Sequence, residues 1–253
     1  MAERKIALVT GAATGIGRAI AVSLARGGFD LAINYSRSLE AAQETERQAR
    51  AEGARTLLIQ GDISNEADVV AMIAAVEETF GGLDLLCNNA GTTIDTPPAK
   101  FDTVSAEEFD RVFAVNVRGT FLVTKHAVRL LRAREKADII NTASIVGLRP
   151  GPQPLPYSAS KAAIVSMTQT LAGALGPSIK VNALAPGWME GDWMERALGS
   201  NYERLMERRA KATPLKRCAT AEDVGITALA LATAMPFTTG QVIVIDGGYA
   251  AVN

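Results

Sequence analysis

Residues 5–28, KIALVTGAATGIGRAIAVSLARGG, carry the clearest fold signal in this chain. The stretch opens with a short run of aliphatic and β-branched residues, which is typical of a buried strand. It then passes through a turn with three glycines, Gly11, Gly15 and Gly17, into a longer apolar pattern with helical spacing that ends in two more glycines. A strand that leads through a glycine turn into a helix is the first half of a strand–helix–strand unit, which joins parallel strands.

The same alternation of strands and helices continues along the whole chain. Strands are predicted at residues 5–10, 30–35, 54–61, 83–88, 137–143, 179–184 and 241–246, and helices at 15–28, 38–52, 65–81, 105–134, 157–175 and 220–233. Strands that are apolar on both faces and separated by helices form a parallel sheet that is covered on both sides. With right-handed crossovers, the sequence therefore predicts an α/β, doubly wound fold.

Length and composition favour one domain. The chain has 253 residues, of which 48% are hydrophobic and 21% are charged, and this is enough for one large core. No linker, repeat or low-complexity tract divides it, so we expect residues 1–253 to fold as a unit. One irregular segment, residues 187–217, lies between a strand and the last long helix and carries both tryptophans.

Several classes of function are disfavoured. The formal net charge of -1 gives no general attraction to nucleic acid or to an anionic membrane. Cys87 and Cys218 form neither a metal-binding spacing nor a disulfide framework, and with His126 as the only histidine we expect no metal site and no histidine triad. The chain enters a strand at once and contains no long apolar run, so we expect no signal peptide and a soluble, cytoplasmic protein.

The segment PLPYSASKAAI, residues 154–164, places a tyrosine and a lysine four positions apart. On a helix, Tyr157 and Lys161 lie on the same face. Their ordinary pKa values are about 10 and about 10.4, and an ammonium group beside a phenol favours the phenolate and lowers the pKa of the tyrosine. Such a pair suits proton transfer near neutral pH. The alternative is a tyrosine and a lysine on a partly exposed helix face.

The glycine turn after the first strand suits the binding of a dinucleotide. Its spacing is GxxxGxG rather than GxGxxG, but in either pattern glycine lets backbone N–H groups approach a pyrophosphate at the positive N-terminus of a helix. The residues expected to contact the dinucleotide here are Gly11, Thr14, Gly15, Ile16 and Gly17. Glycines that serve only the tight turn are the alternative.

Further candidate residues follow the carboxyl ends of other predicted strands, where folds of this kind bind ligands. They are Asp62 and Ile63 after the third strand, Asn89, Ala90 and Gly91 after the fourth, and Pro186 and Gly187 after the sixth. The carboxylate of Asp62 could accept a hydrogen bond from an adenine amino group. Taken alone, Asp62 also fits the entry to the next helix.

Together these motifs resemble those of one family. TGAATGIG (10–17), GDI (61–63), NNAG (88–91), Asn116 in FAVNVRGTF, Ser144 in NTASIVG, YSASK (157–161) and APG (185–187) occur in order over nearly the whole chain. On these motifs the chain resembles the short-chain dehydrogenase/reductase family. The resemblance implies a single-domain Rossmann-type fold with a seven-stranded parallel sheet, a nicotinamide cofactor, and oxidoreductase activity on CH–OH or C=O groups.

The resemblance also implies roles for four residues. Tyr157 would be the general acid/base, and Lys161 would lower its pKa and hold the nicotinamide ribose. Ser144 would polarise the substrate carbonyl, and Asn116 would support a water-mediated proton path to Lys161. Since the cofactor carries the hydride, positioning and one proton transfer are the tasks left to the protein. A nucleotide-sensing protein without turnover is the alternative from a different class, and the four filled positions argue against it.

The end of the second strand indicates which cofactor is preferred. Rossmann sites for NAD usually carry an acidic residue about 20 positions after the glycine motif, but INYSRS (33–38) has Tyr35 at this place. Ser36 and Arg37 follow, and a hydroxyl with a guanidinium suits a 2′-phosphate. NADP(H) is favoured over NAD(H). Glu40 is expected in the first turn of the next helix.

The substrate is indicated less directly. Trp188, Met189, Trp193 and Met194 suit an adaptable apolar lid at about 188–217. The pattern of residues 212–248 is similar to that of 3-oxoacyl-[acyl-carrier-protein] reductases, so a small carbonyl or alcohol substrate is expected, an acyl thioester among the candidates. A dehydrogenase of a sugar, polyol or other small alcohol is the alternative.

The resemblance implies a homotetramer, and the long helices offer a physical route to one. The helices predicted at 105–134 and 157–175 carry apolar and small residues on more than one face. A helix that is apolar around much of its circumference needs a second partner besides its own sheet. Small residues also let symmetry-related helices approach closely.

Overall fold

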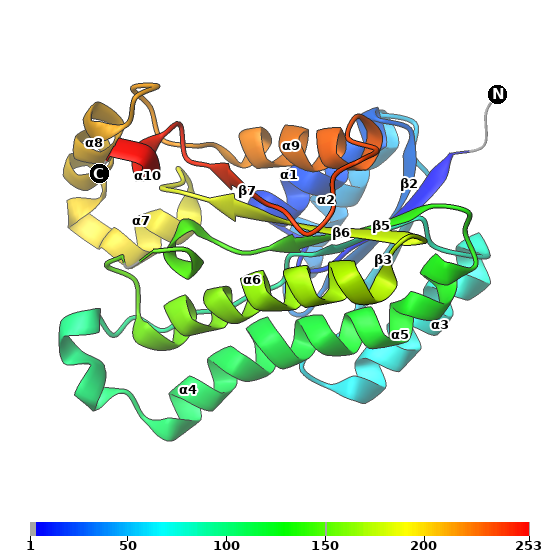
Figure 1. Cartoon of the computed structure of the whole chain (residues 1–253), viewed down its shortest axis with the longest axis horizontal. Coiled ribbons are helices and arrows are strands. Elements are labelled where there is room, and N and C mark those ends of the chain that lie inside the picture. The colour runs from blue at the N-terminus through cyan, green and yellow to red at the C-terminus, as the bar shows by residue number, and fades with distance from the viewer. Residues whose placement is uncertain (1–3, 150, 253) are drawn as a thin grey trace.

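The computed structural model describes residues 4–149 and 151–252. These residues form a parallel sheet of seven strands between two layers of helices (Figure 1), which confirms the predicted fold class. The strands are β1 (Lys5–Val9), β2 (Phe29–Tyr35), β3 (Thr56–Gln60), β4 (Leu85–Asn88), β5 (Ala137–Thr142), β6 (Ile179–Pro186) and β7 (Val242–Ile245). Their order across the sheet is β3-β2-β1-β4-β5-β6-β7.

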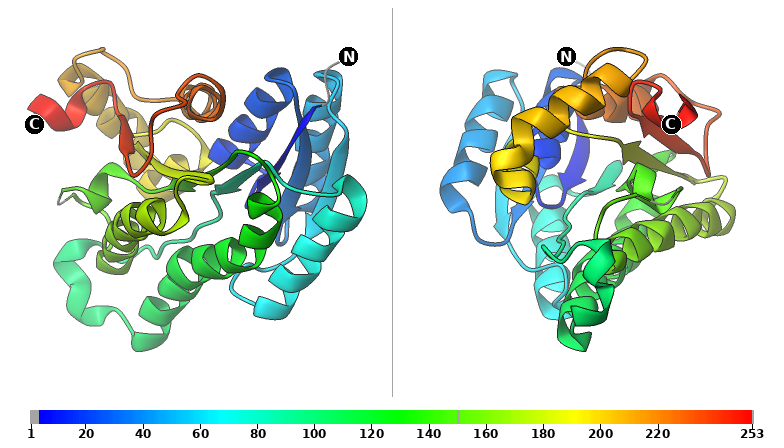
Figure 2. Two further views of the ribbon diagram at one scale, coloured as in Figure 1. Left: turned by 45° about the vertical axis from the view of Figure 1, so that its right-hand side comes forward. Right: turned by 90° about the vertical axis from the view of Figure 1, so that its left-hand side faces the viewer.

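Both faces of the sheet are buried because its side chains alternate between two apolar cores. Along β1, Ala7 and Val9 pack with one set of helices, and Ile6 and Leu8 pack with the other. The first set is α1 (Gly15–Arg26), α2 (Leu39–Ala51) and α9 (Ala221–Thr233); the second is α3 (Glu66–Phe80), α5 (Thr120–Arg132) and α6 (Leu155–Leu175). Figure 2 shows the two layers from other directions.

The strand order reverses beside β1, and this reversal positions the site. Ala7 pairs with Leu31 of β2 on one side and with Leu85 of β4 on the other. From β1 the chain builds the sheet outward through β2 and β3, then returns to β4 and continues in the opposite direction. The carboxyl edge of the sheet beside this reversal is where doubly wound folds bind ligands, so we expect the loops after β1 and β4 to contribute to the site.

One predicted helix differs from the structure. Residues 105–134 were expected as one helix, but α4 (Ala106–Phe113) and α5 are joined by a π-helical turn, η2 (Ala114–Gly119). A single π-helical turn inserts one residue and the chain stays helical on both sides, so a continuous run of helix-forming residues does not reveal it. Within this turn, Asn116 bonds to the backbone of Thr92, and a Cβ on Gly119 would lie only 2.8 Å from Ile63 Cδ1.

The irregular segment forms two short helices that stand apart from the sheet in Figure 1, α7 (Asp192–Leu198) and α8 (Tyr202–Ala212), linked by the 3₁₀ turn η4 (Gly199–Asn201). The other short helices are η1 (Pro98–Thr103), η3 (Ile145–Gly147) and α10 (Tyr249–Val252). No helix among the described residues is long and apolar enough to cross a membrane. Within the same residues, no group of three or more His, Cys, Asp or Glu side chains is placed to hold a metal ion.

Candidate active site

Close packing explains the glycines after β1. Gly11 has a φ of 61°, and a Cβ there would lie 2.7 Å from Ala90 Cα. A Cβ on Gly17 would lie 2.2 Å from Gly11 O, well inside contact distance. The loops after β1 and β4 can therefore meet only because these positions lack side chains.

Hydrogen bonds join these two loops into one surface. Thr10 Oγ1 accepts from the backbone nitrogens of Asn89 and Ala90 at 3.0 and 3.1 Å. Asn89 Nδ2 donates in turn to the carbonyl oxygens of Thr10 and Gly11 at 3.0 and 3.1 Å. Thr14, the N-cap of α1, makes no side-chain capping bond, so the N–H groups of the first turn of α1 remain suited to an anion.

Two positioning residues escaped the sequence analysis. Asn34, buried in β2, accepts from Gly11 N at 3.2 Å and donates to Gly61 O at 3.1 Å, so it links the loops after β1 and β3. Arg18 donates to Ala13 O at 2.7 Å and to Ala41 O at 3.1 Å, which holds the glycine turn against α2. In the sequence, each is only a polar residue within a mainly apolar strand or helix, and this does not reveal which backbone groups it bonds.

Asp62 lies in the turn after β3 and does not begin the helix. Its Oδ1 accepts from Ser64 N at 2.9 Å and Ser64 Oγ at 2.7 Å. Asn65 is the N-cap of α3 and accepts from Ala67 N at 3.0 Å. The helix-entry interpretation of Asp62 was therefore wrong, because Asn65 provides that cap. Ile63 is buried behind this turn.

Ser36 and Arg37 follow β2 and are both exposed, whereas Tyr35 is buried. The carbonyl of Ser36 accepts from Gln60 Nε2 at 3.1 Å, so this loop is held to β3. Arg37 forms no ion pair within the described residues, and its guanidinium is therefore open to an external anion. Glu40 lies in the first turn of α2, as predicted.

Lys161 lies on α6 and is 5% exposed, with its Nζ donating to Thr142 O of β5 at 2.7 Å. The same Nζ lies 5.6 Å from the centroid of the Tyr157 ring, so the expected meeting of the two side chains occurs. Burial lowers the pKa of Lys161 to about 8. A Cβ on Gly147 would lie 2.6 Å from the carbonyl carbon of Lys161, so η3 is pressed directly against α6.

The pKa of Tyr157 differs from the sequence-based expectation. Burial raises it to about 12, and a hydrogen bond with Ser144 acts weakly in the opposite direction. Lys161 was expected to lower the pKa of Tyr157, and this effect is absent in the protein alone. The ammonium group lies over the ring of Tyr157 and bonds to Thr142 O rather than to the Tyr157 hydroxyl. Desolvation, which disfavours the phenolate, therefore prevails over the neighbouring charge.

Asn116 and Lys161 both lie next to Gly91. Its Oδ1 accepts from Thr92 N at 2.7 Å, and its Nδ2 donates to Thr92 O at 3.0 Å and Ser160 Oγ at 2.9 Å. A Cβ on Gly91 would lie 3.3 Å from Asn116 Oδ1 and 3.7 Å from Lys161 Nζ. Glycine at this position thus leaves space between the amide and the ammonium group, and the water-mediated path stays a prediction.

Ser144 follows β5 as the N-cap of η3, and its side chain contacts the end of β6. Its Oγ donates to Pro186 O at 3.5 Å and accepts from Val146 N at 3.4 Å. Both contacts are long, so they hold the hydroxyl only weakly, and it also bonds to the Tyr157 side chain. Gly187 N donates to Ile245 O at 2.9 Å, and a Cβ on Gly187 would lie 2.5 Å from Asp246 Cβ. The APG motif therefore passes close to β7.

Trp193 of α7 covers the candidate catalytic tyrosine. Its ring centroid lies 6.1 Å from that of Tyr157, with the planes at 62°, an edge-to-face contact. The irregular segment thus reaches the reacting group itself. Tyr157, Ser144 and Lys161 gather in one place, whereas Arg37 and Asp62 lie at the ends of β2 and β3.

This combination of a glycine turn at the sheet reversal and a tyrosine–lysine–serine group defines a nicotinamide-dependent oxidoreductase acting on carbonyl or alcohol groups. A family profile described as enoyl-(acyl carrier protein) reductase matches residues 11–250. The chain belongs to the short-chain dehydrogenase/reductase family, as its motifs predicted.

Relatives and solved structures match along nearly their full lengths. The chain is 38% identical over 251 residues to a 3-oxoacyl-[acyl-carrier-protein] reductase of Staphylococcus aureus, covering 98% of this chain and 99% of that protein. It is similar to the structure of 3-oxoacyl-[acyl-carrier protein] reductase from Brucella melitensis in complex with NAD (TM-score 0.90, 34% identity, 100% of both chains). It is also similar to that of a gluconate 5-dehydrogenase from Burkholderia cenocepacia in complex with NADP and tartrate (TM-score 0.89, 31% identity, 98% of this chain and 96% of that one).

Proposed function

We propose that this protein is an NADPH-dependent carbonyl reductase of the 3-oxoacyl type. The observation that carries the proposal is the grouping of Ser144, Tyr157 and Lys161 at the carboxyl edge of the sheet, beside the glycine turn. The likeness to 3-oxoacyl-[acyl-carrier-protein] reductases from two organisms supports the choice of substrate class.

A nicotinamide dinucleotide fits the loops after β1 and β4 and the first turn of α1. The loops after β1 and β4 present backbone at positions where a Cβ would clash, and the first turn of α1 offers N–H groups to a pyrophosphate. When bound, the nicotinamide supplies or accepts the hydride. We assign contacts with the dinucleotide to Gly11, Thr14, Gly15, Ile16, Gly17, Ser36, Arg37, Asp62, Ile63, Asn89, Ala90, Gly91, Tyr157, Lys161, Pro186 and Gly187.

Four side chains of the protein perform the proton transfer and hold the substrate oxygen. The Tyr157 hydroxyl donates its proton to the oxygen of the substrate, and the Ser144 hydroxyl holds the same oxygen by a second hydrogen bond. Lys161, whose pKa is about 8, holds the ribose and returns the proton to Tyr157. Asn116, which is fixed by its bonds to Thr92 and Ser160, supports a water-mediated proton path to Lys161.

A substrate screen tests this function. Purified protein would be mixed with NADPH and, separately, with an acetoacetyl thioester, a diketone, a quinone and an aldose, and NADPH oxidation would be followed by absorbance. We expect the acetoacetyl thioester to give the highest kcat/KM. Oxidation of a polyol or sugar acid with no thioester reduction would favour the second candidate, which the likeness to gluconate 5-dehydrogenase supports. Cofactor binding without any turnover would favour a nucleotide sensor.

Arg37 is expected to determine the preference for NADPH. Removal of its exposed guanidinium deletes a charge-assisted contact with the 2′-phosphate, which is worth roughly 1.5–3 kcal/mol. Arg37→Ala should therefore raise the Kd for NADPH by about one to two powers of ten and leave that for NADH nearly unchanged. The control is Arg132→Ala, which removes the same charge from the exposed end of α5. Equal affinities for NADPH and NADH in the unmutated protein would refute the assignment.

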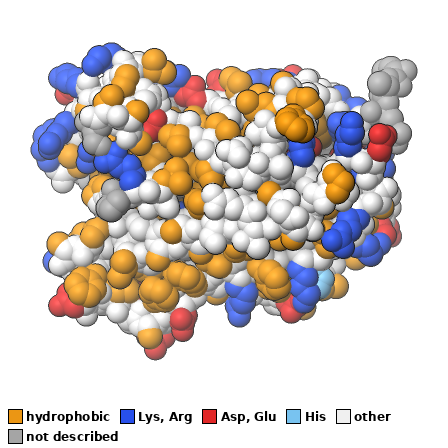
Figure 3. Space-filling view, viewed as in Figure 1, with side chains coloured by type: hydrophobic (Ala, Val, Ile, Leu, Met, Phe, Trp, Pro, Cys, Tyr) orange, Lys and Arg blue, Asp and Glu red, His pale blue; other side chains and the backbone are white. Residues whose placement is uncertain are grey.

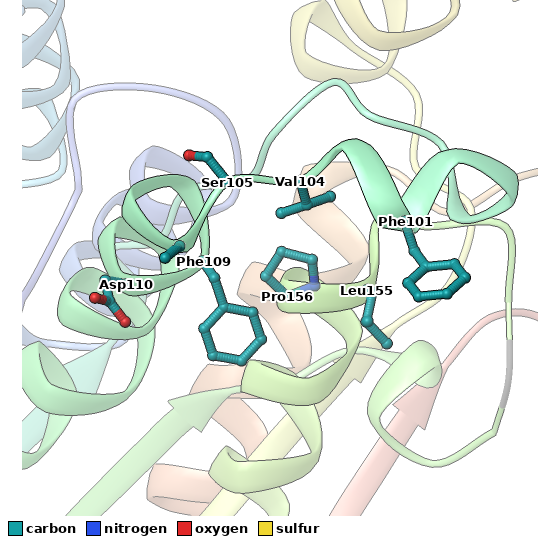
Figure 4. A pocket seen from close by; sticks show the side chains of 8 residues that line it. Phe101, Val104, Ser105, Phe109, Asp110, Leu155 and Pro156 are labelled. Carbon is teal, nitrogen blue, oxygen red and sulfur yellow. The ribbon is translucent and has the colours of Figure 1, made fainter.

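We also propose that four copies assemble. Hydrophobic side chains line the edge formed by α4, α5 and α6 in Figure 3, where Phe121 is 52% exposed and Leu155 50% exposed. A hollow of about 370 Å³ opens on the same edge, between η1, α4 and the start of α6, and Phe101, Phe109 and Leu155 point into it (Figure 4). An apolar surface of this kind is usually covered by a partner.

Light scattering at micromolar concentration tests the assembly. We expect a mass close to four times the chain mass of 26.6 kDa. Phe121→Glu should shift the mass toward smaller species, because a carboxylate cannot be buried between apolar helices. Leu39→Glu, a similarly exposed position on α2, should not. A mass near 26.6 kDa for the unmutated protein would exclude the tetramer.

A further inference from the structure

Arg209 of α8 lies between two aromatic rings that come from distant parts of the chain. Its guanidinium carbon is 4.3 Å from the centroid of the Trp188 ring and 5.6 Å from that of Tyr249. Its Nη1 donates a hydrogen bond to the Tyr249 hydroxyl. Its Nε is buried and has no hydrogen-bond partner among the described residues. The guanidinium is therefore held mainly by the faces of the rings, which is a cation–π arrangement.

Each ring belongs to an element that bears on the site. Trp188 follows Gly187, the last residue of the APG motif at the end of β6, and lies just before α7. Tyr249 begins α10, which lies beside α8 at the end of the molecule away from the N-terminus in Figure 1. The stack thus joins the irregular segment both to the end of β6 and to the last helix of the chain.

The same last helix also holds the loop that follows Ser144. Arg149, just beyond η3, donates from Nη1 to Ala250 O at 3.0 Å. The start of α10 is fixed in turn by Asp246, whose two carboxylate oxygens accept from Gly248 N at 2.8 Å and Ala250 N at 2.7 Å. One short helix therefore bonds to both walls of the candidate substrate site, the loop at Arg149 and the segment that carries Arg209.

We propose that Arg209 and Tyr249 are positioning residues that hold the substrate lid, residues 188–217, in place beside Tyr157 through α10. Trp193 on the same lid contacts the Tyr157 ring, so a shift of α7 and α8 would move the wall that a substrate meets beside the reacting hydroxyl. The glycine turn after β1 and the loop after β4 have no part in the stack, and Gly187, which precedes Trp188, is held separately by its backbone bond to Ile245 O. Substrate affinity should therefore depend on Arg209 and Tyr249, and cofactor affinity should not. This inference rests on the proposed function.

Two substitutions test the proposal by kinetics. Tyr249→Phe removes the hydroxyl that Arg209 bonds, and Arg209→Met removes the cation but keeps an unbranched side chain. Each should raise the KM of the best substrate by about tenfold, while kcat stays within about twofold and the Kd for NADPH is unchanged. Arg209→Lys should restore part of the lost affinity, since it keeps the charge. Arg208→Met, the exposed neighbour on α8, should behave as the unmutated protein.

A second measurement needs no turnover. In a Trp193→Phe background, Trp188 is the only tryptophan, so its fluorescence reports on the stack directly. Tyr249→Phe and Arg209→Met should make Trp188 more accessible to acrylamide quenching, and Arg208→Met should not. Increased quenching without any detectable turnover would support the stack and contradict only the proposed function. The proposal is overturned if KM and Trp188 quenching are both unaffected, or if the variants weaken NADPH binding instead. Should Arg209→Met fail to fold, Tyr249→Phe, which removes one oxygen, still decides between these outcomes.

Discussion

Tyr157→Phe is expected to lower kcat by about two to four powers of ten, the usual contribution of a general acid or base. The substitution removes the only proton that the Tyr157 side chain can donate and leaves the ring, which packs against Trp193. Tyr157 is half-buried, and desolvation raises its pKa to about 12, so in the protein alone the hydroxyl is protonated at neutral pH and ready to donate. Single-turnover measurements with saturating NADPH would separate this loss from a change in binding.

Two controls make the result specific to proton transfer. The Kd for NADPH should change little in Tyr157→Phe, since the glycine turn and the loop after β4 are untouched. Ser144→Ala should also lower kcat, because it removes the second bond to the substrate oxygen and the hydrogen bond to Tyr157. A Tyr157→Phe protein with kcat near that of the unmutated protein would contradict the mechanism.

The architecture was predictable because it depends on patterns that the sequence displays directly. Apolar runs set the seven strands, and the glycines at 11 and 17 sit where only glycine fits. The π-helical turn at Ala114–Gly119 was not predicted, because the chain stays helical on both sides of the inserted residue. The stack of Arg209 between Trp188 and Tyr249 joins residues far apart in sequence, so no local pattern could reveal it.

The pKa values of the site could not be predicted from the sequence. The spacing of Tyr157 and Lys161 correctly predicted that the side chains meet, but not the direction of the tyrosine pKa shift. That direction depends on how much water burial removes and on where the lysine ammonium points. Both are properties of the packed structure, since Thr142 O on β5 accepts the bond from Lys161. Residue types and spacing therefore indicated the candidate site, and packing determined the direction of the tyrosine pKa shift.

Lys161→Met is expected to abolish most turnover while it stabilises the fold near neutral pH. Loss of the ammonium group removes a charge-assisted contact with the ribose, so the Kd for NADPH should rise by roughly tenfold or more. Methionine keeps most of the apolar stem, which limits the loss of packing at this buried position. Retention of both turnover and cofactor affinity would rule out the proposed role of Lys161.

The stability effect follows from the sign of the pKa shift. Burial lowers the pKa of Lys161 from 10.5 to about 8, so between these values the unfolded chain binds a proton that the folded protein lacks. The free energy of unfolding therefore rises with pH across this window through Lys161, and below pH 8 the buried charge costs about 3 kcal/mol. Lys161→Met removes this contribution. Urea unfolding of both proteins at pH 7 and at pH 10 should show the variant ahead at pH 7 and its advantage largely lost at pH 10, because by then the lysine of the folded protein is neutral. An advantage that is the same at both pH values would mean that Lys161 carries no burial cost.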